Sequence, residues 1–166
     1  LELGEVGGML SRGGVQSMFF TQAIVILALS LGGLLTALGI LPALLSGIKD
    51  TLTTSGRAIF AAAMSALSIN VLIGEQYLSI LLSGTAFRPT FERLNLHPKN
   101  LSRTIEDAGT VINPLVPWSV CGVFISQALG VPVLDYLPYA FFCYLSLLLT
   151  ILFGFTGITI SRLKSH

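Results

Sequence analysis

The charged residues of this 166-residue chain are confined to short stretches, and long segments between them carry almost no charge. Only 10% of the residues are Asp, Glu, Lys or Arg, against about 25% in ordinary soluble domains. A soluble chain of this size would expose apolar patches larger than a monomer tolerates. The segments without charge are Gly13–Ile48, Ala108–Leu134 and Tyr136–Ser161, and Ala58–Phe87 contains Glu75 as its single charged residue.

Each of these segments is long enough to cross a bilayer, which takes about 20 mainly apolar residues. The segments must be helical, because lipid cannot satisfy backbone N–H and C=O groups. The sequence therefore predicts an all-α polytopic membrane protein with the lipid bilayer as its partner, and the net charge of +1 gives no indication of nucleic-acid binding. The expected membrane segments are Phe19–Leu45, Ala58–Phe87, Gly109–Val133 and Leu137–Ile160.

Polar residues interrupt the second segment at its middle, where Asn70, Gly74, Glu75 and Gln76 follow a run of small residues. A carboxylate at membrane depth costs about 2.5–3.5 kcal/mol, so it is rarely present without a partner or a function. Glycine weakens a helix, so the segment should either bend at Gly74 or turn back as a re-entrant hairpin. An ion or proton site at Glu75 is favoured over a protein contact or a position near the headgroups.

The third segment contains Pro114 and Pro117, which should open its helix over about one turn. Irregular backbone at membrane depth is tolerated where it is buried in protein or lines a cavity, and transporters use such broken helices to bind ions. Asp107, Thr110 and Asn113 follow at helical spacing, which places their oxygen-bearing side chains on one face. The alternative is a proline kink that serves packing only.

The Lys and Arg residues gather in the loop expected at Gly84–Asp107 and near the C-terminus. The positive-inside rule places both in the cytoplasm, whether the second segment spans or re-enters. The loop is interpreted as mainly solvated, with a short helix at Leu101–Asp107. The Cys and His residues follow no metal-ligand spacing, so we expect no cofactor, no metal beyond a transported ion, and no enzyme.

Long stretches of the chain resemble the C-terminal half of the NhaC-type Na⁺/H⁺ antiporters. This family belongs to the ion-transporter superfamily and includes malate/lactate–sodium exchangers. The resemblance covers Arg12–Ile160, and the stretches that carry it are RGGVQSMFFTQAIVILALSLGGLL, IGEQYLSILLSG, HPKNLSRTIEDAGTVINPLVPWSVCGVF and LGVPVLDYLPYAFF. The family often has Asp at the position of Glu75, Ser at that of Ala108 and Asn at that of Ser119.

The resemblance implies a protein about twice this length, built from two inverted repeats, with residues 1–166 as its C-terminal half. Each repeat would supply a re-entrant hairpin and a discontinuous helix, which here are the second and third segments. The missing N-terminal half would be a required partner, and a homodimer stays open. The family also implies an integral protein of a bacterial or archaeal cytoplasmic membrane.

These features predict secondary Na⁺/H⁺ antiport by alternating access. Na⁺ would bind near the bilayer midplane, where the tip of the second segment meets the break in the third, and one carboxylate would also carry the exchanged proton. The alternative on the same fold is a sodium- or proton-coupled exchanger of organic anions, of the malate/lactate type. The expected ion-binding residues are Glu75, Gln76, Asp107, Thr110 and Asn113, and the expected helix breaks are at Gly74, Pro114 and Pro117.

Overall fold

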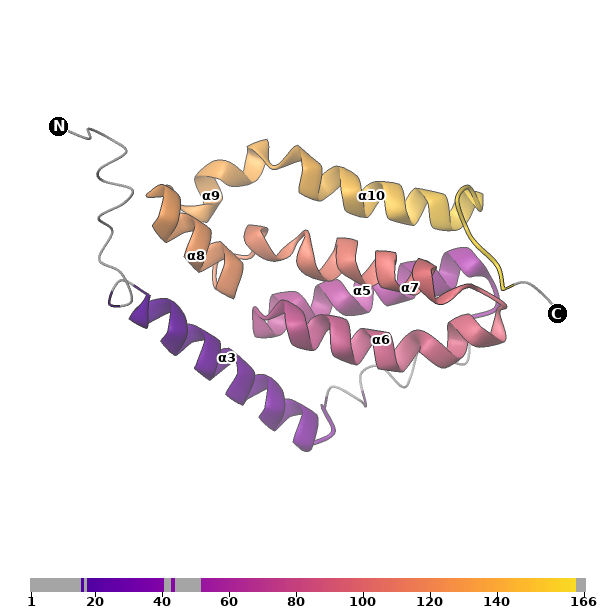
Figure 1. Ribbon diagram of the computed structural model, residues 1–166, viewed down its shortest axis with the longest axis horizontal. Helices are drawn as coiled ribbons and strands as arrows, with labels where there is room; N and C mark the ends of the chain where they lie inside the picture. Colours follow the sequence, from indigo (N-terminus) through magenta and orange to yellow (C-terminus); the bar gives the residue numbers. More distant parts are fainter. Residues whose placement is uncertain (1–15, 17, 41–42, 44–51, 164–166) are drawn as a thin grey trace.

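The computed structural model describes residues 16, 18–40, 43 and 52–163, and this part of the chain is helical, as expected (Figure 1). Helices α5, α6, α7 and α10 lie along the long axis as a bundle, and α3 runs obliquely to them with its first turns near α8. The elements are α3 (Phe19–Ala37), α5 (Ser55–Ile73), α6 (Gln76–Arg93), α7 (Pro98–Ile105), the π-helical turn η2 (Glu106–Thr110), the 3₁₀ turn η3 (Asn113–Leu115), α8 (Val120–Leu129), α9 (Val133–Tyr136), η4 (Leu137–Tyr139) and α10 (Phe141–Thr156).

The second predicted segment is a helical hairpin made of α5 and α6. Helix α5 ends at Gly74, whose φ of 76° lies in the left-handed region that glycine adopts without strain. The chain reverses there, and α6 returns along α5. The Ser79 hydroxyl donates to the carbonyl of Ala66 at 2.5 Å, which ties the two helices together. The second segment is therefore interrupted at Gly74 by a hairpin.

The third predicted segment is a broken helix. Its first half starts at Pro98, a favourable first-turn position for proline, and continues through α7, η2 and η3. Its second half is α8. Ser119 caps the start of this helix by accepting a hydrogen bond from the Gly122 N–H at 2.9 Å. The halves are bent by 44°, and Pro117 lies between them, whereas Pro114 lies in the 3₁₀ turn that ends the first half.

The expectation of a solvated loop over Gly84–Asp107 is wrong. Helix α6 continues to Arg93 and α7 begins at Pro98, so only a four-residue turn separates them. The basic residues conceal an amphipathic pattern, because apolar side chains of the same stretch are buried in the core. The buried side chains are Phe87, Phe91, Leu101 and Ile105, whereas Arg88, Arg93 and Lys99 are exposed.

Helix α10 packs against α5 through two glycines. A Cβ atom on Gly154 would lie 2.8 Å from the Ile59 side chain, and one on Gly56 would lie 2.7 Å from the Phe155 ring. Such close contacts are typical of helices that associate in lipid, where small residues let backbones approach. The packing places α10 beside the broken helix as well as beside α5.

The end of the described chain returns to the turn between α6 and α7. The side chain of Asn100 donates to the carbonyl of Ser161 at 2.6 Å and accepts from its N–H at 3.1 Å. Leu96 and Arg162 also form a β-bridge. The segment that follows α10 is therefore tied to the start of the broken helix.

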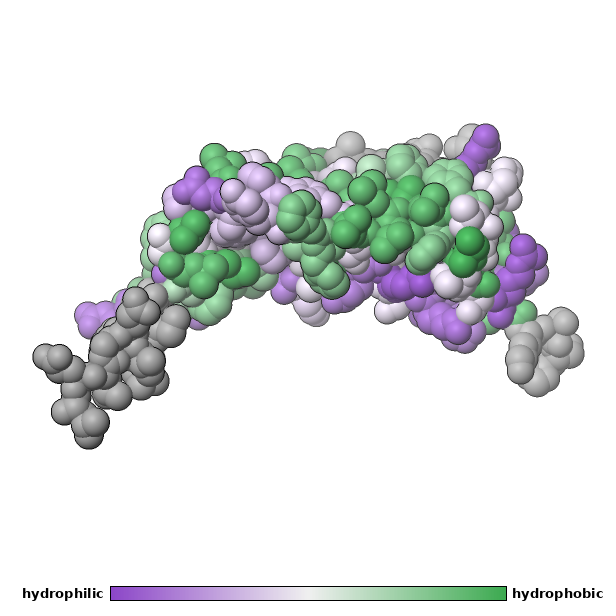
Figure 2. Space-filling view, turned by 90° about the horizontal axis from the view of Figure 1, so that it is seen from above, coloured by the Kyte–Doolittle hydropathy of each residue, from purple (hydrophilic) through white to green (hydrophobic). Residues whose placement is uncertain are grey.

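Helices α3 and α5 each have the length and apolar composition to cross a membrane. The number becomes four if each bent helix pair, α7–α8 and α9–α10, is taken as one span. The face over α10 is largely apolar, and hydrophilic residues gather toward the end of the molecule nearest the C-terminus (Figure 2). This distribution agrees with the sequence-based prediction of a membrane protein.

Candidate functional site: the hairpin tip at the broken helix

The tip of the α5–α6 hairpin lies against the break between η3 and α8. The carbonyl of Gly74 accepts from the Val120 N–H at 3.0 Å, and the Trp118 indole donates to the carbonyl of Val71 at 2.7 Å. A Cβ atom at position 74 would lie 3.0 Å from the Trp118 carbonyl oxygen. Glycine is therefore required here for the close approach as well as for its positive φ.

Two fully buried asparagines join the hairpin to both halves of the broken helix. Asn113 donates from Nδ2 to Oδ1 of Asn70 at 2.6 Å, and Asn70 donates from Nδ2 to the carbonyl of Gly109 at 2.6 Å. Oδ1 of Asn113 accepts from the Cys121 N–H at 3.1 Å. A buried polar network whose members are satisfied favours one arrangement of the elements it joins, so this pair holds the tip at the break.

Hydroxyl groups bind the carbonyls around the two prolines, and the carbonyl of Asn113 also accepts a backbone hydrogen bond from the Val116 N–H at 3.1 Å. Ser119 donates to the carbonyl of Asn113 at 2.6 Å, and Tyr136 donates to that of Pro114 at 2.5 Å. A carbonyl oxygen has two lone pairs. The Pro114 carbonyl therefore keeps an acceptor position after Tyr136 has bound.

Glu75 begins α6 at the hairpin tip, with only 9% of its surface exposed. Its Oε2 accepts from the Leu78 N–H at 2.9 Å, so the carboxylate caps α6 and faces the positive end of that helix. The next residue, Gln76, has a buried Oε1 that finds no hydrogen-bond partner among the described residues. The tip thus presents carboxylate and amide oxygens with unused lone pairs, the donor type that hard cations prefer.

The structure divides the predicted Asp107–Thr110–Asn113 face between two neighbours. Asn113 contacts the hairpin, whereas the Asp107 carboxylate accepts from Ser146 at 2.6 Å and from Thr150, both on α10. The reason is the π-helical turn, in which the Val111 N–H donates to the carbonyl of Glu106 five residues back. The extra residue changes the helical phase between positions 107 and 113. Thr110 lies half-buried at the end of this turn.

The model of the Na⁺/H⁺ antiporter family matches residues 1–158. The chain belongs to the Na⁺/H⁺ antiporter family. No solved structure matches it.

Relatives of this antiporter-family chain include antiporters named for different solutes. It is 48% identical over 160 residues to the Na⁺/H⁺ antiporter NhaC of Alkalihalophilus pseudofirmus, covering 96% of the chain and 35% of that protein. It is 42% identical over 152 residues to the arginine/ornithine antiporter ArcD of Halobacterium salinarum (92% of the chain, 31% of that protein). The malate-2H⁺/Na⁺-lactate antiporter of Bacillus subtilis is 32% identical over 152 residues, which cover 92% of the chain and 32% of that protein. The chain thus spans about a third of these relatives' lengths, less than the half expected from the resemblance.

Sequence reasoning missed several residues that the structure brings to the broken helix. Asn70 was visible as a polar residue in an apolar segment, but its partner Asn113 lies 43 residues away. Ser146 and Thr150 are four residues apart in a mainly apolar helix, which was a usable signal for a polar face. Tyr136 also binds the break, because its hydroxyl donates to the Pro114 carbonyl.

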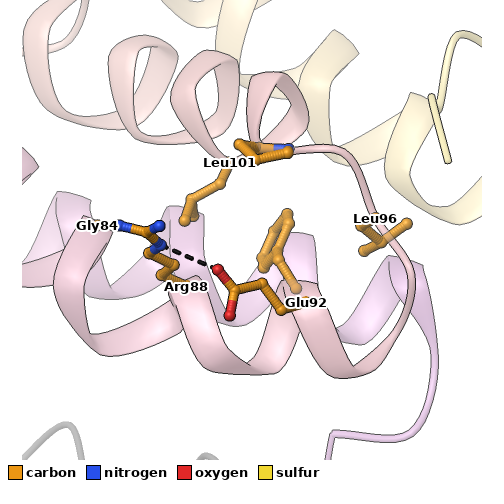
Figure 3. A pocket seen from close by; sticks show the side chains of 7 residues that line it. Gly84, Arg88, Glu92, Leu96 and Leu101 are labelled. Atoms are coloured by element: carbon orange, nitrogen blue, oxygen red, sulfur yellow. Dashed lines mark hydrogen bonds and ion pairs between the residues drawn. The ribbon is translucent and has the colours of Figure 1, made fainter. Parts of the chain in front are cut away.

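A separate pocket lies between α6 and the start of α7, away from the hairpin tip (Figure 3). Its charged lining residues are Arg88 and Glu92, which form an ion pair one helical turn apart at 3.0 Å. Both side chains are more than half exposed, and such surface pairs contribute little to stability. This pocket holds no group of the predicted ion site.

Proposed function

We propose that the chain is part of a longer Na⁺/H⁺ antiporter and that Na⁺ binds where the α5–α6 tip meets the broken helix. The observation that carries the proposal is Glu75, a buried carboxylate at a glycine-broken hairpin tip that docks on a proline-broken helix. A buried charge is expensive at membrane depth, and such residues typically serve ion or proton pathways. Family membership supports the same function.

The ligands we propose for Na⁺ are oxygen atoms at this junction. They come from the Glu75 carboxylate, the unpartnered Gln76 side-chain oxygen and the second lone pair of the Pro114 carbonyl. We assign the Asn70–Asn113 pair to fixing the position of the broken helix, because the donors and acceptors of both side chains join the hairpin to the two halves of that helix. Thr110 and Asp107 both lie on the π-helical turn, and we propose that they take part in cation binding from there.

Exchange follows from competition for one carboxylate. Na⁺ binding favours the ionised carboxylate, and protonation favours release of Na⁺, so the two ions occupy the site in alternation. We infer that the hairpin and the broken helix move together during alternating access, since the asparagine pair and the Gly74 carbonyl join them. The hairpin would then be re-entrant, with the α6–α7 turn and the segment after α10 in the cytoplasm.

The proposal is tested by Na⁺-dependent proton exchange in the full-length transporter, reconstituted in vesicles. Glu75→Gln keeps the size of the side chain and an oxygen that can cap α6, but removes the charge. We expect its exchange rate to fall at least about 100-fold, as expected when an essential charged group is removed.

Glu92→Gln is the matched control, because it makes the same substitution on α6 at an exposed carboxylate paired with Arg88. It should leave exchange within about twofold of the wild type, since exposed ion pairs are weak. Asp107→Asn is measured in parallel. Wild-type exchange in both Glu75→Gln and Asp107→Asn would contradict the proposal.

A second candidate is coupled exchange of organic solutes, which the arginine/ornithine and malate/lactate relatives favour. Identity to the NhaC antiporter is higher, which ranks cation exchange first. The two functions are separated by adding malate, lactate, arginine or ornithine to vesicles during Na⁺-driven flux. Inhibition or counterflow by one of these solutes would support the second function.

A further inference from the structure

The Asp107 carboxylate lies at a polar site that is separate from the hairpin tip. Its Oδ1 accepts from the Ser146 hydroxyl at 2.6 Å, and its Oδ2 accepts from the Thr150 hydroxyl. Ser146 and Thr150 are four residues apart on α10, so both lie on the face that meets the broken helix. Thr150 is only 3% exposed. Three oxygen-bearing side chains therefore converge between two helices.

The π-helical turn separates this cluster from the asparagine pair. Gly109 follows Asp107 by two residues, and its carbonyl accepts from Asn70 on α5. Residues two apart lie on roughly opposite faces of a helical turn. One side of η2 is thus bound to the hairpin, and the other side presents Asp107 to α10.

The surroundings of Asp107 leave its charge without an ion pair. A groove next to it is lined by Arg103, Ser146, Thr150 and the rings of Phe142 and Phe153. Arg103 does not bind the carboxylate, because its Nη1 donates to Thr159 at 3.2 Å and its guanidinium lies over the Phe153 ring. Within the described residues, no cationic nitrogen lies within 4.0 Å of the carboxylate.

We propose that Asp107, Ser146 and Thr150 form a second Na⁺ site, on the α10 side of the broken helix. One carboxylate among neutral oxygens matches a single positive charge. The part of the chain that the structure describes holds no group of three or more Asp, Glu, His and Cys side chains of the kind that divalent metals use. The site rests on the proposed cation transport and extends it, because α10 becomes a ligand-bearing helix.

Binding needs only a rotation of the two hydroxyl groups. Ser146 and Thr150 now donate their protons to Asp107. In a helix, each hydroxyl can instead donate to the carbonyl four residues back, which turns its lone pairs toward a cation held by the carboxylate. No proton is gained or lost in this step.

The test uses the full-length transporter and NaCl as the probe, with two readouts. The first is the Na⁺ concentration that half-saturates exchange, and the second is the rise in melting temperature that Na⁺ produces in the purified protein. Thr150→Val and Ser146→Ala, singly and together, remove ligand oxygens, while Thr150→Ser keeps one. Thr156→Val is the matched control, because its exposed hydroxyl donates to its own helix at the carbonyl of Leu152.

We expect the double variant to raise the half-saturating Na⁺ concentration by at least about tenfold, a loss typical of weakened metal sites. It should also lose most of the Na⁺-induced rise in melting temperature, whereas the single variant Thr150→Ser should keep both properties close to the wild type. Thr156→Val should change neither. If the double variant is too unstable to purify, Thr150→Val against Thr150→Ser makes the same comparison.

A purely structural role predicts a different pattern. The variants would then melt at a lower temperature without Na⁺ but keep the wild-type Na⁺-induced shift and half-saturation, and that result would overturn the second site. The proposed function can fail independently, because wild-type protein without Na⁺-dependent proton exchange would reject antiport whatever the melting data show. Conversely, loss of exchange in Glu75→Gln with unchanged Na⁺ response in the double variant would reject only the α10 site.

Discussion

Helices α3 and α5 are both 19 residues long and apolar enough to cross a bilayer, yet they occupy opposite environments. Only 11% of the 18-residue apolar stretch of α3 is buried within the described structure, against 61% of the corresponding stretch of α5. Helix α3 exposes large side chains along its length, whereas α5 is enclosed by α6, α10 and the broken helix. Hydropathy therefore identifies the solvent of a helix but not its neighbours.

The side chains that distinguish the two helices are the small and polar ones. Helix α5 buries a run of alanines together with Ser65 and Asn70, which allow close packing and provide a hydrogen-bonded contact. The buried positions of α3 are Thr21, Ala28 and Gly32, and Thr21 donates to Gln127 of α8 at 3.0 Å. Three substitutions in the full-length transporter test this contrast.

The largest effect is expected for Asn70→Leu in α5. The change removes two hydrogen bonds, so the Gly109 carbonyl loses its side-chain donor and the Asn113 amide keeps only a long hydrogen bond to the Gly74 carbonyl at 3.5 Å. Leaving buried polar groups unsatisfied costs about 1–3 kcal/mol each, so we expect the apparent melting temperature to fall sharply and exchange to be lost. Ser30→Leu in α3 is the matched control, because its exposed hydroxyl binds only its own helix, and a comparable loss there would contradict the contrast.

An intermediate effect is expected where α10 contacts α5. Gly154→Ala places a methyl group 2.8 Å from the Ile59 side chain, and overpacking of this kind costs about 1–3 kcal/mol. Gly33→Ala makes the same change in α3 at a position with no atom within 4 Å. There alanine should stabilise the helix by up to about 1 kcal/mol. Equal melting temperatures for the two variants would show that α10 does not pack on α5 as described.

The smallest effect is expected for Thr21→Val, which removes the hydrogen bond between α3 and α8. Interhelical hydrogen bonds in membranes contribute about 0.6 kcal/mol on average. The melting temperature should fall slightly, with Na⁺ half-saturation unchanged. A fall in melting temperature as large as that of Asn70→Leu would contradict the contrast, because it would show that a polar contact holds α3 in place.

Several features of the candidate site were predictable because they arise from local backbone chemistry. Gly74 ends a helix and the Pro114/Pro117 pair interrupts one, whatever surrounds them. Glu75 stood out in the sequence because its segment carries no other charge, whereas its burial within the protein is seen only in the structure. Helices α6 and α7 were harder to predict over Gly84–Asp107, because basic residues on the exposed face concealed the buried apolar face.

The pairing of side chains was not predictable. Asn70 and Asn113 meet only because the hairpin returns to the break, and no local pattern relates two positions 43 residues apart. The orientation of Asp107 depends on a single π-helical turn, which the spacing of Asp107, Thr110 and Asn113 does not reveal. Without that turn, the helical repeat placed all three on one face.

The sequence by itself determined the solvent of this chain and the points where its helices break. Charge density settles the first, because lipid excludes charged residues, and glycine and proline settle the second through their own backbone. Only the tertiary structure decided which neighbour each polar group meets. It directs Asn113 to the hairpin and Asp107 to α10, because helical phase and the packing of distant segments, rather than residue type, set these contacts.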